Sequence, residues 1–177
     1  MNKEMQKKLT TLVDTDILVS IYTDSDEPES FLFGYLLQID NNNILINIIN
    51  SFGEEDGFCT INLSDIFIFD EDKMYSRKIQ NLFEIKKQTR KYIANLDTRP
   101  IVDLLKHAVG NNLLIEVNED NNYIGHIYSF SAETLVIQVI DNYCNDIGTV
   151  TIDMKHINIL KCQNRPLKDL ELLYSRK

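Results

Sequence analysis

Shortages of cysteine and glycine each exclude a class of protein. The three cysteines, Cys59, Cys144 and Cys162, lie far apart, form no C-x-x-C pair and leave one over from any pairing, so a disulfide framework is not expected. The six glycines provide neither a phosphate-binding G-x-x-x-x-G-K loop nor a G-x-S-x-G nucleophile elbow. The sequence therefore lacks the motifs of the commonest phosphate-binding and hydrolytic enzymes.

Long hydrophobic runs are missing as well. No stretch of about 18 uncharged apolar residues occurs that could span a bilayer, and the N-terminal segment MNKEMQKKLTTLVDTD has no apolar run long enough for a signal peptide. We therefore expect a cytoplasmic protein with no membrane contact. The many Asn, Ile and Lys residues indicate an AT-rich bacterial or phage genome.

Positive charge is scarce relative to negative charge. The chain has 18 Lys and Arg against 27 Asp and Glu, which gives a net charge of −9 and a pI near 4.8. Affinity for nucleic acid depends on neutralising phosphates with basic side chains, so this balance disfavours nonspecific binding to phosphate backbones.

A repeat is the most informative feature that is present. The stretch that begins at Gly34 is matched, 91 residues later and without a gap, by the stretch that begins at Gly125. Upstream of it the offset becomes 96, and the difference falls in one loop, where insertions cost little. The paired residues are Leu9 and Leu105, Gly34 and Gly125, Ile46 and Ile137, Gly57 and Gly148, Thr60 and Thr151, Ile61 and Ile152, and Ile68 and Ile159.

Each repeat predicts the same elements. Apolar residues spaced by four predict a short amphipathic helix at about 5–13 and again at 101–109. Short β-branched runs separated by Asn, Asp and Gly predict five strands in each copy, and a closing helix follows at about 75–85 and 166–175. The predicted strands are 17–22, 31–39, 44–50, 58–63 and 66–69, then 113–117, 123–130, 135–141, 149–154 and 157–161.

This pattern predicts a mainly β protein with flanking helices, built as two tandem five-stranded barrels. The first unit covers 1–95 and includes a basic linker helix, and the second covers 96–177. Barrel closure removes exposed sheet edges. Gly34 and Gly125 lie within β-branched strands, where glycine permits a sharp bend or a close backbone approach.

The second copy also contains a pattern that resembles the Sm/LSm family, one of the SH3-like small barrels. Its members are Ile115, Val117, Tyr123, Gly125, Ile127, Phe130 and the apolar run 135–137. The resemblance implies RNA binding through an Asp and an Asn in the loop after the bent strand and through a later Arg-Gly pair. The first copy has Asp40 and Asn43, but the second has Ser131 and Thr134, and the Arg-Gly pair is replaced by Asn62-Leu63 and Asp153-Met154.

Candidate chemical groups do not form a recognisable catalytic or metal set. His107, His126 and His156 lack the close pairing along the chain that zinc ligands usually have. No feature selects two particular carboxylates from the 27 acidic residues. We therefore expect no enzyme activity and no cofactor.

The segment 73–92 concentrates positive charge, with seven basic residues and one acidic residue. On a helix, Lys86 and Arg90 would lie along one flank, as would Lys87 and Lys91. Such a ridge has two interpretations. It could bind nucleic acid, anionic lipid or an acidic partner, or it could offset the acidic residues of its own chain.

Two functions follow from these patterns. The first is a noncatalytic binding module that recognises a protein or peptide, for instance by accepting a strand at an exposed sheet edge, and that can also form homo-oligomers through edge strands. The alternative is RNA binding through the loop of the first copy and the basic linker. The candidate binding residues are Tyr35, Asp40, Asn43, Lys86, Lys87, Arg90 and Lys91.

Overall fold

The computed structural model describes residues 3–26, 31–71, 73–96, 99–118 and 123–175. The α-helices are α1 (Lys3–Leu12), α2 (Lys73–Ile85), α3 (Pro100–Gly110) and α4 (Arg165–Tyr174), and a short 3-10 helix covers Met154–His156. The strands are β1 (Leu18–Tyr22), β2 (Leu32–Ile39), β3 (Asn43–Ile49), β4 (Glu55–Asn62), β5 (Ile68–Asp70), β6 (Leu114–Val117), β7 (Tyr123–Phe130), β8 (Thr134–Ile140), β9 (Asp146–Asp153) and β10 (Ile159–Cys162). No helix in these ranges is long and apolar enough to cross a membrane.

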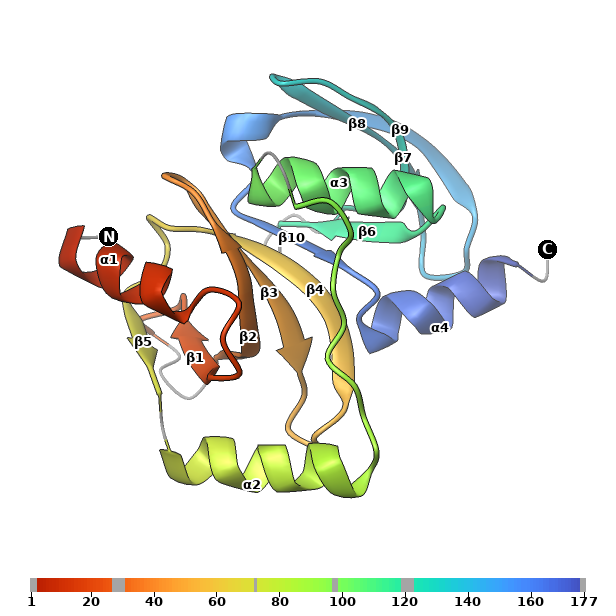
Figure 1. Ribbon diagram of the computed structural model, residues 1–177. Coiled ribbons are helices and arrows are strands. Elements are labelled where there is room, and N and C mark those ends of the chain that lie inside the picture. The colour runs from red at the N-terminus through yellow and green to blue at the C-terminus, as the bar shows by residue number, and fades with distance from the viewer. Residues whose placement is uncertain (1–2, 27–30, 72, 97–98, 119–122, 176–177) are drawn as a thin grey trace.

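All ten strands belong to one antiparallel sheet, in the order β5-β1-β2-β3-β4-β10-β6-β7-β8-β9 (Figure 1). The prediction of two tandem five-stranded Sm-like or SH3-like barrels is therefore wrong. The physical reason is the partner of β4, which pairs with β10 of the other half over Phe58–Ile61. Because that edge of β4 is occupied, β5 has β1 as its one partner among the described strands, and the first half does not close on itself.

The strand registers nevertheless repeat with the offsets found in the sequence. Each half contains the same run of antiparallel pairings, from its fifth strand through its first to its fourth. A β-bulge also recurs at the same place in β2 and β7. The equivalent features are the pairs Gly34–Ile48 and Gly125–Val139, the pairs Leu18–Tyr35 and Leu114–His126, and the bulges Leu36/Gln38 and Ile127/Ser129.

There are two large apolar cores, and both include residues from each half. They lie on opposite faces of β3 and β4, because Leu45 and Phe58 belong to one core and their neighbours Ile46 and Cys59 to the other. Helix α1 contributes Leu9 and Leu12 to one core, which Ile159 of β10 also joins. Helix α3 dominates the other core and contacts β3 and β4 as well as β7 and β10. Phe58 of β4 packs in that second core, so burial of apolar surface joins the halves in addition to the β4–β10 ladder.

Helices α2 and α4 cover two smaller clusters that are equivalent in the two halves. In the first, Ile79 and Phe83 of α2 pack on residues of β1, β2 and β3. In the second, Leu167 of α4 packs on Leu114 and Ile140, with Leu170 and Tyr174 nearby. Each closing helix therefore packs on its own half through residues that correspond at the repeat offset, Ile79 and Phe83 in α2 and Leu170 and Tyr174 in α4.

The two strand glycines are explained by close backbone approach, as predicted. A Cβ atom on Gly34 would lie 2.1 Å from the carbonyl oxygen of Asn47, and one on Gly125 would lie 2.0 Å from that of Gln138. No side chain fits at such a distance, so glycine is required at both places.

Candidate functional site

The predicted basic ridge does not form, because α2 ends at Ile85 and residues 86–96 continue outside the helix. The amide of Gln88 donates to the carbonyl of Phe83, and that of Lys87 donates to Glu84, while Lys87 adopts a positive φ of 53°. This is the hydrogen-bond pattern of a Schellman motif, which terminates a helix. The four candidate cations therefore do not share one helical flank.

Arg90 is buried against its own chain, with a side chain only 9% exposed. Its guanidinium donates to the carbonyl of Thr15 at 2.9 Å and pairs with Asp14 at 3.2 Å and Asp16 at 3.5 Å. It also lies between two aromatic rings, 4.9 Å from the centroid of Tyr35 and 4.7 Å from that of Tyr92. These contacts use the charge of Arg90 to fix the linker to the first half.

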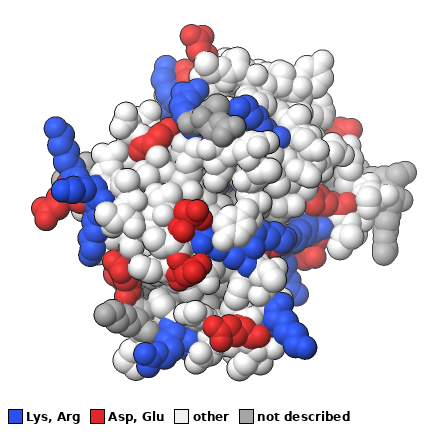
Figure 2. All heavy atoms as spheres, in the orientation of Figure 1, with Lys and Arg blue, Asp and Glu red and all other residues white. Residues whose placement is uncertain are grey.

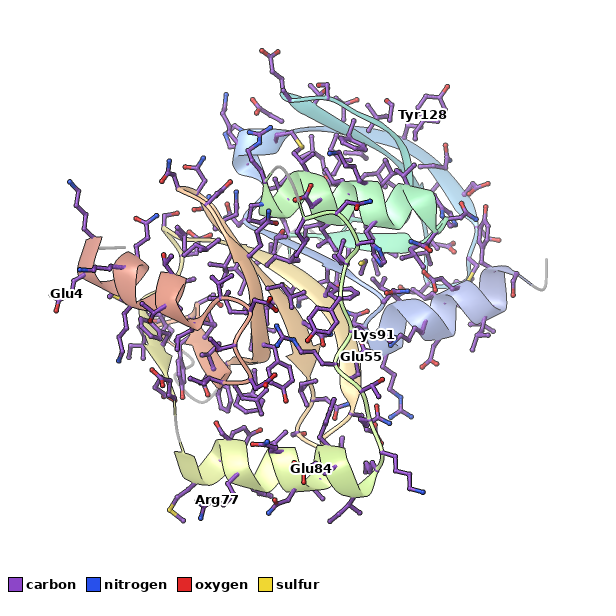
Figure 3. All side chains as sticks on the ribbon, in the orientation of Figure 1. Glu4, Glu55, Arg77, Glu84, Lys91 and Tyr128 are labelled. Atoms are coloured by element: carbon purple, nitrogen blue, oxygen red, sulfur yellow. The ribbon has the colours of Figure 1, made fainter. Side chains whose placement is uncertain are left out.

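The lysines of the linker also pair with acidic residues of the first half. Lys86 Nζ lies 2.6 Å from Glu54, and Lys91 Nζ lies 2.7 Å from Glu55. Figure 3 shows Lys91 and Glu55 together near α4, and on the face shown in Figure 2 basic side chains lie beside acidic ones. Lys87 alone of the four has no ion-pair partner in the described chain, so the segment chiefly offsets the chain's own acidic charge.

Glu55 is the point where β4, the linker and α4 meet. Its side chain is 6% exposed and also accepts hydrogen bonds from the backbone of Gly57 at 2.8 Å and from Lys168 at 3.4 Å. Burial alone would raise the pKa of this carboxyl, but the bonds from Lys91, Gly57 and Lys168 outweigh it, so the pKa lies below its usual value. The Glu55 carboxylate thus links the two halves electrostatically.

The first-copy candidates Tyr35 and Asp40 have structural environments. Tyr35 is buried beside Phe83, and burial raises the pKa of its hydroxyl. Asp40 closes the turn between β2 and β3, where one carboxylate oxygen accepts from the amides of Asn42 and Asn43, both at 2.7 Å. The side-chain amide of Asn43, in contrast, has no hydrogen-bond partner among the described residues.

Asn43 faces a polar hollow of about 310 Å³ at the junction of the two halves. The first half supplies three asparagines, and the segments around α3 and the 3-10 helix supply two cations. The hollow is lined by Asn42, Asn43, Asn62, Arg99, Ile101, Ala132, Met154, Lys155 and Ile157. It brings one loop candidate together with second-half residues, but Tyr35 and the linker cations lie elsewhere.

The histidines and cysteines are not gathered into a site. No group of three or more His, Cys, Asp or Glu residues that could hold a metal ion occurs within the described ranges. All three cysteines are buried as free thiols, and burial raises the pKa of Cys162. His126 packs against Tyr174, and burial lowers the pKa of its ring.

The open edge of β9 is the most distinctive surface of the molecule. Residues Thr149–Ile152 of β9 correspond, at the repeat offset, to Phe58–Ile61 of β4, which β10 covers. The four residues of β4 are at most 2% exposed, whereas Thr149 and Thr151 are exposed and Val150 and Ile152 only partly buried. Among the strands of the described ranges, β9 pairs with β8 alone.

Hydrogen-bond geometry shows which amides face this edge. The amide of Met154 donates across to Glu133, on the β8 side. Because backbone groups alternate along a strand, the amides of Thr149, Thr151 and Asp153 point away from β8, toward the open edge. Three donors are therefore aligned along a strand with no Lys or Pro to block pairing.

Gly148 and its counterpart Gly57 both have a positive φ, but their surroundings differ. Both have positive φ values, 114° and 82°. A Cβ atom on Gly57 would lie 2.3 Å from the carbonyl oxygen of Cys162, whereas nothing lies within 4 Å of the same position on Gly148. The space that the β10 segment fills beside β4 is thus open beside β9.

Sequence reasoning did not select this edge. The available signal was a difference between the copies, because the apolar Phe58 of β4 is matched by the polar Thr149 of β9. No protein-family model, curated protein or solved structure matches the chain.

Proposed function

We propose that this protein is a noncatalytic binding module that recognises an extended segment of a protein by adding it as a strand to the open edge of β9. The observation that carries the proposal is the contrast between two equivalent edges. The β4 edge is covered by β10 and fully buried, whereas the β9 edge has aligned amides and open space. Strand addition uses main-chain hydrogen bonds for affinity and alternate side chains for specificity.

The side chains of β9 indicate what an added strand should contain. Val150 and Ile152 are partly buried against the second-half core, and Thr149 and Thr151 are exposed on the other face. An incoming strand with apolar residues at alternate positions extends that core and leaves polar residues toward solvent. In the covered junction, Ile159 of β10 lies opposite Ile61, the counterpart of Ile152, and extends the core of the first half in this way.

A peptide of the sequence INILKCQ, residues 157–163, is a suitable probe because this segment already pairs with the equivalent strand in the chain. We expect a fluorescein-labelled probe to bind the protein in an anisotropy titration. Thr151→Pro should abolish binding, since proline removes an amide donor at the open edge but leaves the β8 ladder intact. Thr151→Val keeps the amide and should bind normally. Equal binding by all three proteins would refute the proposal.

RNA binding is the second candidate function, and the polar hollow favours it. Its asparagine amides and the cations Arg99 and Lys155 suit a single-stranded base and its phosphate. The net charge of −9 opposes it, as does the pairing of Lys155 with Asp153 at 2.8 Å. A mixed-sequence single-stranded RNA should bind at low salt, weaken steeply with added salt and bind less well to Arg99→Ala. No retention at low salt would eliminate this candidate.

Two further features support a nonenzymatic role in a reducing compartment. Strand β9 has backbone amides, threonine hydroxyls and the carboxylates of Asp146 and Asp153, but no His, Cys or Lys that could act as a nucleophile or as a general acid at neutral pH. Three buried free thiols suit a cytoplasmic location, where disulfides are rare. Mass spectrometry of protein isolated from its host under alkylating conditions would detect any disulfide and so test the location.

A further inference from the structure

We propose that the strand bound at the β9 edge is β5 of a second copy of this chain, so that copies join head to tail. This inference rests on the proposed function and names the partner of the same site. Its template is the junction inside the chain, where a fourth strand, β4, pairs with a fifth strand, β10. Each chain also has a fourth strand with an open edge, β9, and a fifth strand with an open edge, β5, and these lie at opposite ends of the sheet (Figure 1).

Strand β5 pairs with β1 in the same register as β10 pairs with β6, so the register of the β4–β10 junction can be applied to a β9–β5 contact. Phe69 lies opposite Ile21 in the β5–β1 ladder, as Leu160 lies opposite Val117 in the β10–β6 ladder. Applying the register of the internal junction, Phe69 of one copy meets Thr151 of the other, and Ile68 meets Ile152. Ile68 is 47% exposed in the single chain, and this contact would cover it.

Charges next to the internal junction are matched by charges at the free edges. At the start of β4, Glu55 pairs with Lys168 of α4 at 3.4 Å. The equivalent of Glu55 is Asp146 at the start of β9, and the equivalent of Lys168 is Arg77 on α2. Both are exposed, and Arg77 has no ion-pair partner in the described part of the chain. A head-to-tail contact therefore places an acid opposite a base, as the internal junction does.

Two exposed apolar side chains are also brought together. Next to the Glu55–Lys168 pair, Asp56 accepts a hydrogen bond from the backbone of Arg165 at 2.6 Å. The equivalent positions are Ile147, which is 62% exposed, and Met74, which is 85% exposed. The acid at the internal position is thus replaced by an isoleucine that meets a methionine, and their contact removes apolar surface from water.

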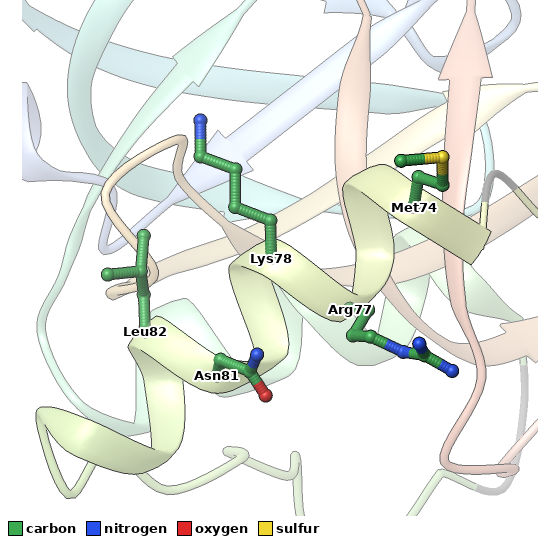
Figure 4. A pocket seen from close by; sticks show the side chains of 5 residues that line it. All are labelled: Met74, Arg77, Lys78, Asn81 and Leu82. Atoms are coloured by element: carbon green, nitrogen blue, oxygen red, sulfur yellow. The ribbon is translucent and has the colours of Figure 1, made fainter.

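The position of α2 permits this contact because α2 lies on the first half as α4 lies on the second. Phe83 of α2 packs edge-on to Tyr35, and Tyr174 of α4 packs against His126 at the equivalent positions. Figure 4 shows Met74 and Arg77 one turn apart on α2. Both residues lie near the start of α2, which begins three residues after β5 ends.

One difference makes the proposed contact weaker than its template. Asp70 and Glu71 of the first half stand where the second half has Lys161 and the fully buried Cys162. Carboxylates near a new interface carry a desolvation cost. Self-association should therefore be reversible and depend on concentration. Because a β9–β5 contact joins unlike surfaces, it builds rings or open filaments rather than symmetric dimers.

Charge reversal provides the test, with sedimentation velocity of the purified full chain as the measurement. Wild type should associate as concentration rises. Arg77→Asp and Asp146→Arg should each weaken association by about ten-fold or more, because each places like charges together. An equimolar mixture of the two variants should associate again, since each contact then pairs opposite charges. Lys78→Asp changes the same charge one residue away and should associate like wild type.

A wild-type chain that remains monomeric throughout, or two variants whose mixture does not recover, would overturn the inference. The peptide titration separates that failure from failure of the proposed function. If INILKCQ binds at β9 while the chain stays monomeric, the edge accepts a strand from another protein and only this inference is lost. If the peptide does not bind and the chain is monomeric, both are lost.

Discussion

At the residue scale, the absence of a side chain at Gly34 and Gly125 determines how closely neighbouring strands approach. The hydrogen that replaces a side chain at Gly34 allows the carbonyl of Asn47 to approach within a distance that a Cβ would occupy. The same holds at Gly125 in the second half. These positions were predictable from the sequence, because a lone glycine among β-branched residues is costly unless the backbone requires it.

Gly34→Ala should lower the free energy of unfolding by about 1–3 kcal/mol, because the added methyl group must push the β2 and β3 backbones apart. Gly110→Ala is a matched control. Nothing lies within 4 Å of a Cβ at Gly110, and alanine is favoured over glycine in a helix, so this variant should be as stable as wild type or more so. Urea denaturation of both variants measures the difference. Equal effects would contradict the contact geometry.

Glu55 is the residue whose ionisation should influence stability most clearly. Burial opposes its charge, but Lys91, Gly57 and Lys168 stabilise the carboxylate and lower its pKa in the folded chain. A lowered folded pKa contributes stability that is present above the unfolded value of about 4.3 and lost as pH falls through the folded pKa. Lys91 and Lys168 come from the linker and from α4, so the sequence around Glu55 does not predict these partners.

Glu55→Gln should reduce unfolding free energy at pH 7 by about 1–3 kcal/mol, since a neutral amide cannot stabilise two lysines. The variant should also lose less stability than wild type between neutral pH and pH 3. Glu54→Gln, at an exposed pair, should have a much smaller effect. Denaturation at a series of pH values tests both statements, and parallel curves for wild type and Glu55→Gln would show that Glu55 does not titrate in this range.

At the scale of elements, helix and strand positions followed closely from the sequence, but the linker did not. The predicted helix ended near Ile85, but the linker was expected to be helical as well because its basic residues are spaced by four, and no glycine marks the helix end. Lys87 adopts the left-handed conformation that glycine usually supplies there. Tertiary contacts of Arg90 with Tyr35, Asp14 and Thr15 fix the linker, and such contacts have no signature in local sequence.

Arg90→Lys should destabilise the protein by about 1–2 kcal/mol although charge is retained, because lysine cannot reproduce the planar, multiply bonded position between Tyr35 and Tyr92. Lys87→Gln, a change at the exposed cation of the same segment, should stay within about 0.5 kcal/mol of wild type. Thermal unfolding followed by circular dichroism compares them. A larger loss of stability in Lys87→Gln than in Arg90→Lys would contradict the conclusion that the contacts of Arg90 fix the linker to the first half.

For the whole molecule, the sequence revealed the duplication but not how the copies are joined. Alternating apolar residues specify which face of a strand is buried, yet they do not specify which strand lies beside it. Barrel closure was expected because it removes edges, but pairing of β4 with β10 removes one edge from each half and leaves β5 and β9 open. The candidate site is a consequence of that one pairing, so it lay beyond prediction from the separate copies.

Amide hydrogen exchange resolved by NMR tests most directly whether β9 is an open edge that accepts a strand. In the monomeric Arg77→Asp variant, we predict slow exchange for Thr60, which β10 covers, and fast exchange for Thr151. Saturating INILKCQ should slow Thr149, Thr151 and Asp153 together and leave Thr60 unchanged. Exchange at Thr151 that is already as slow as at Thr60, or that is indifferent to the peptide, would contradict the account.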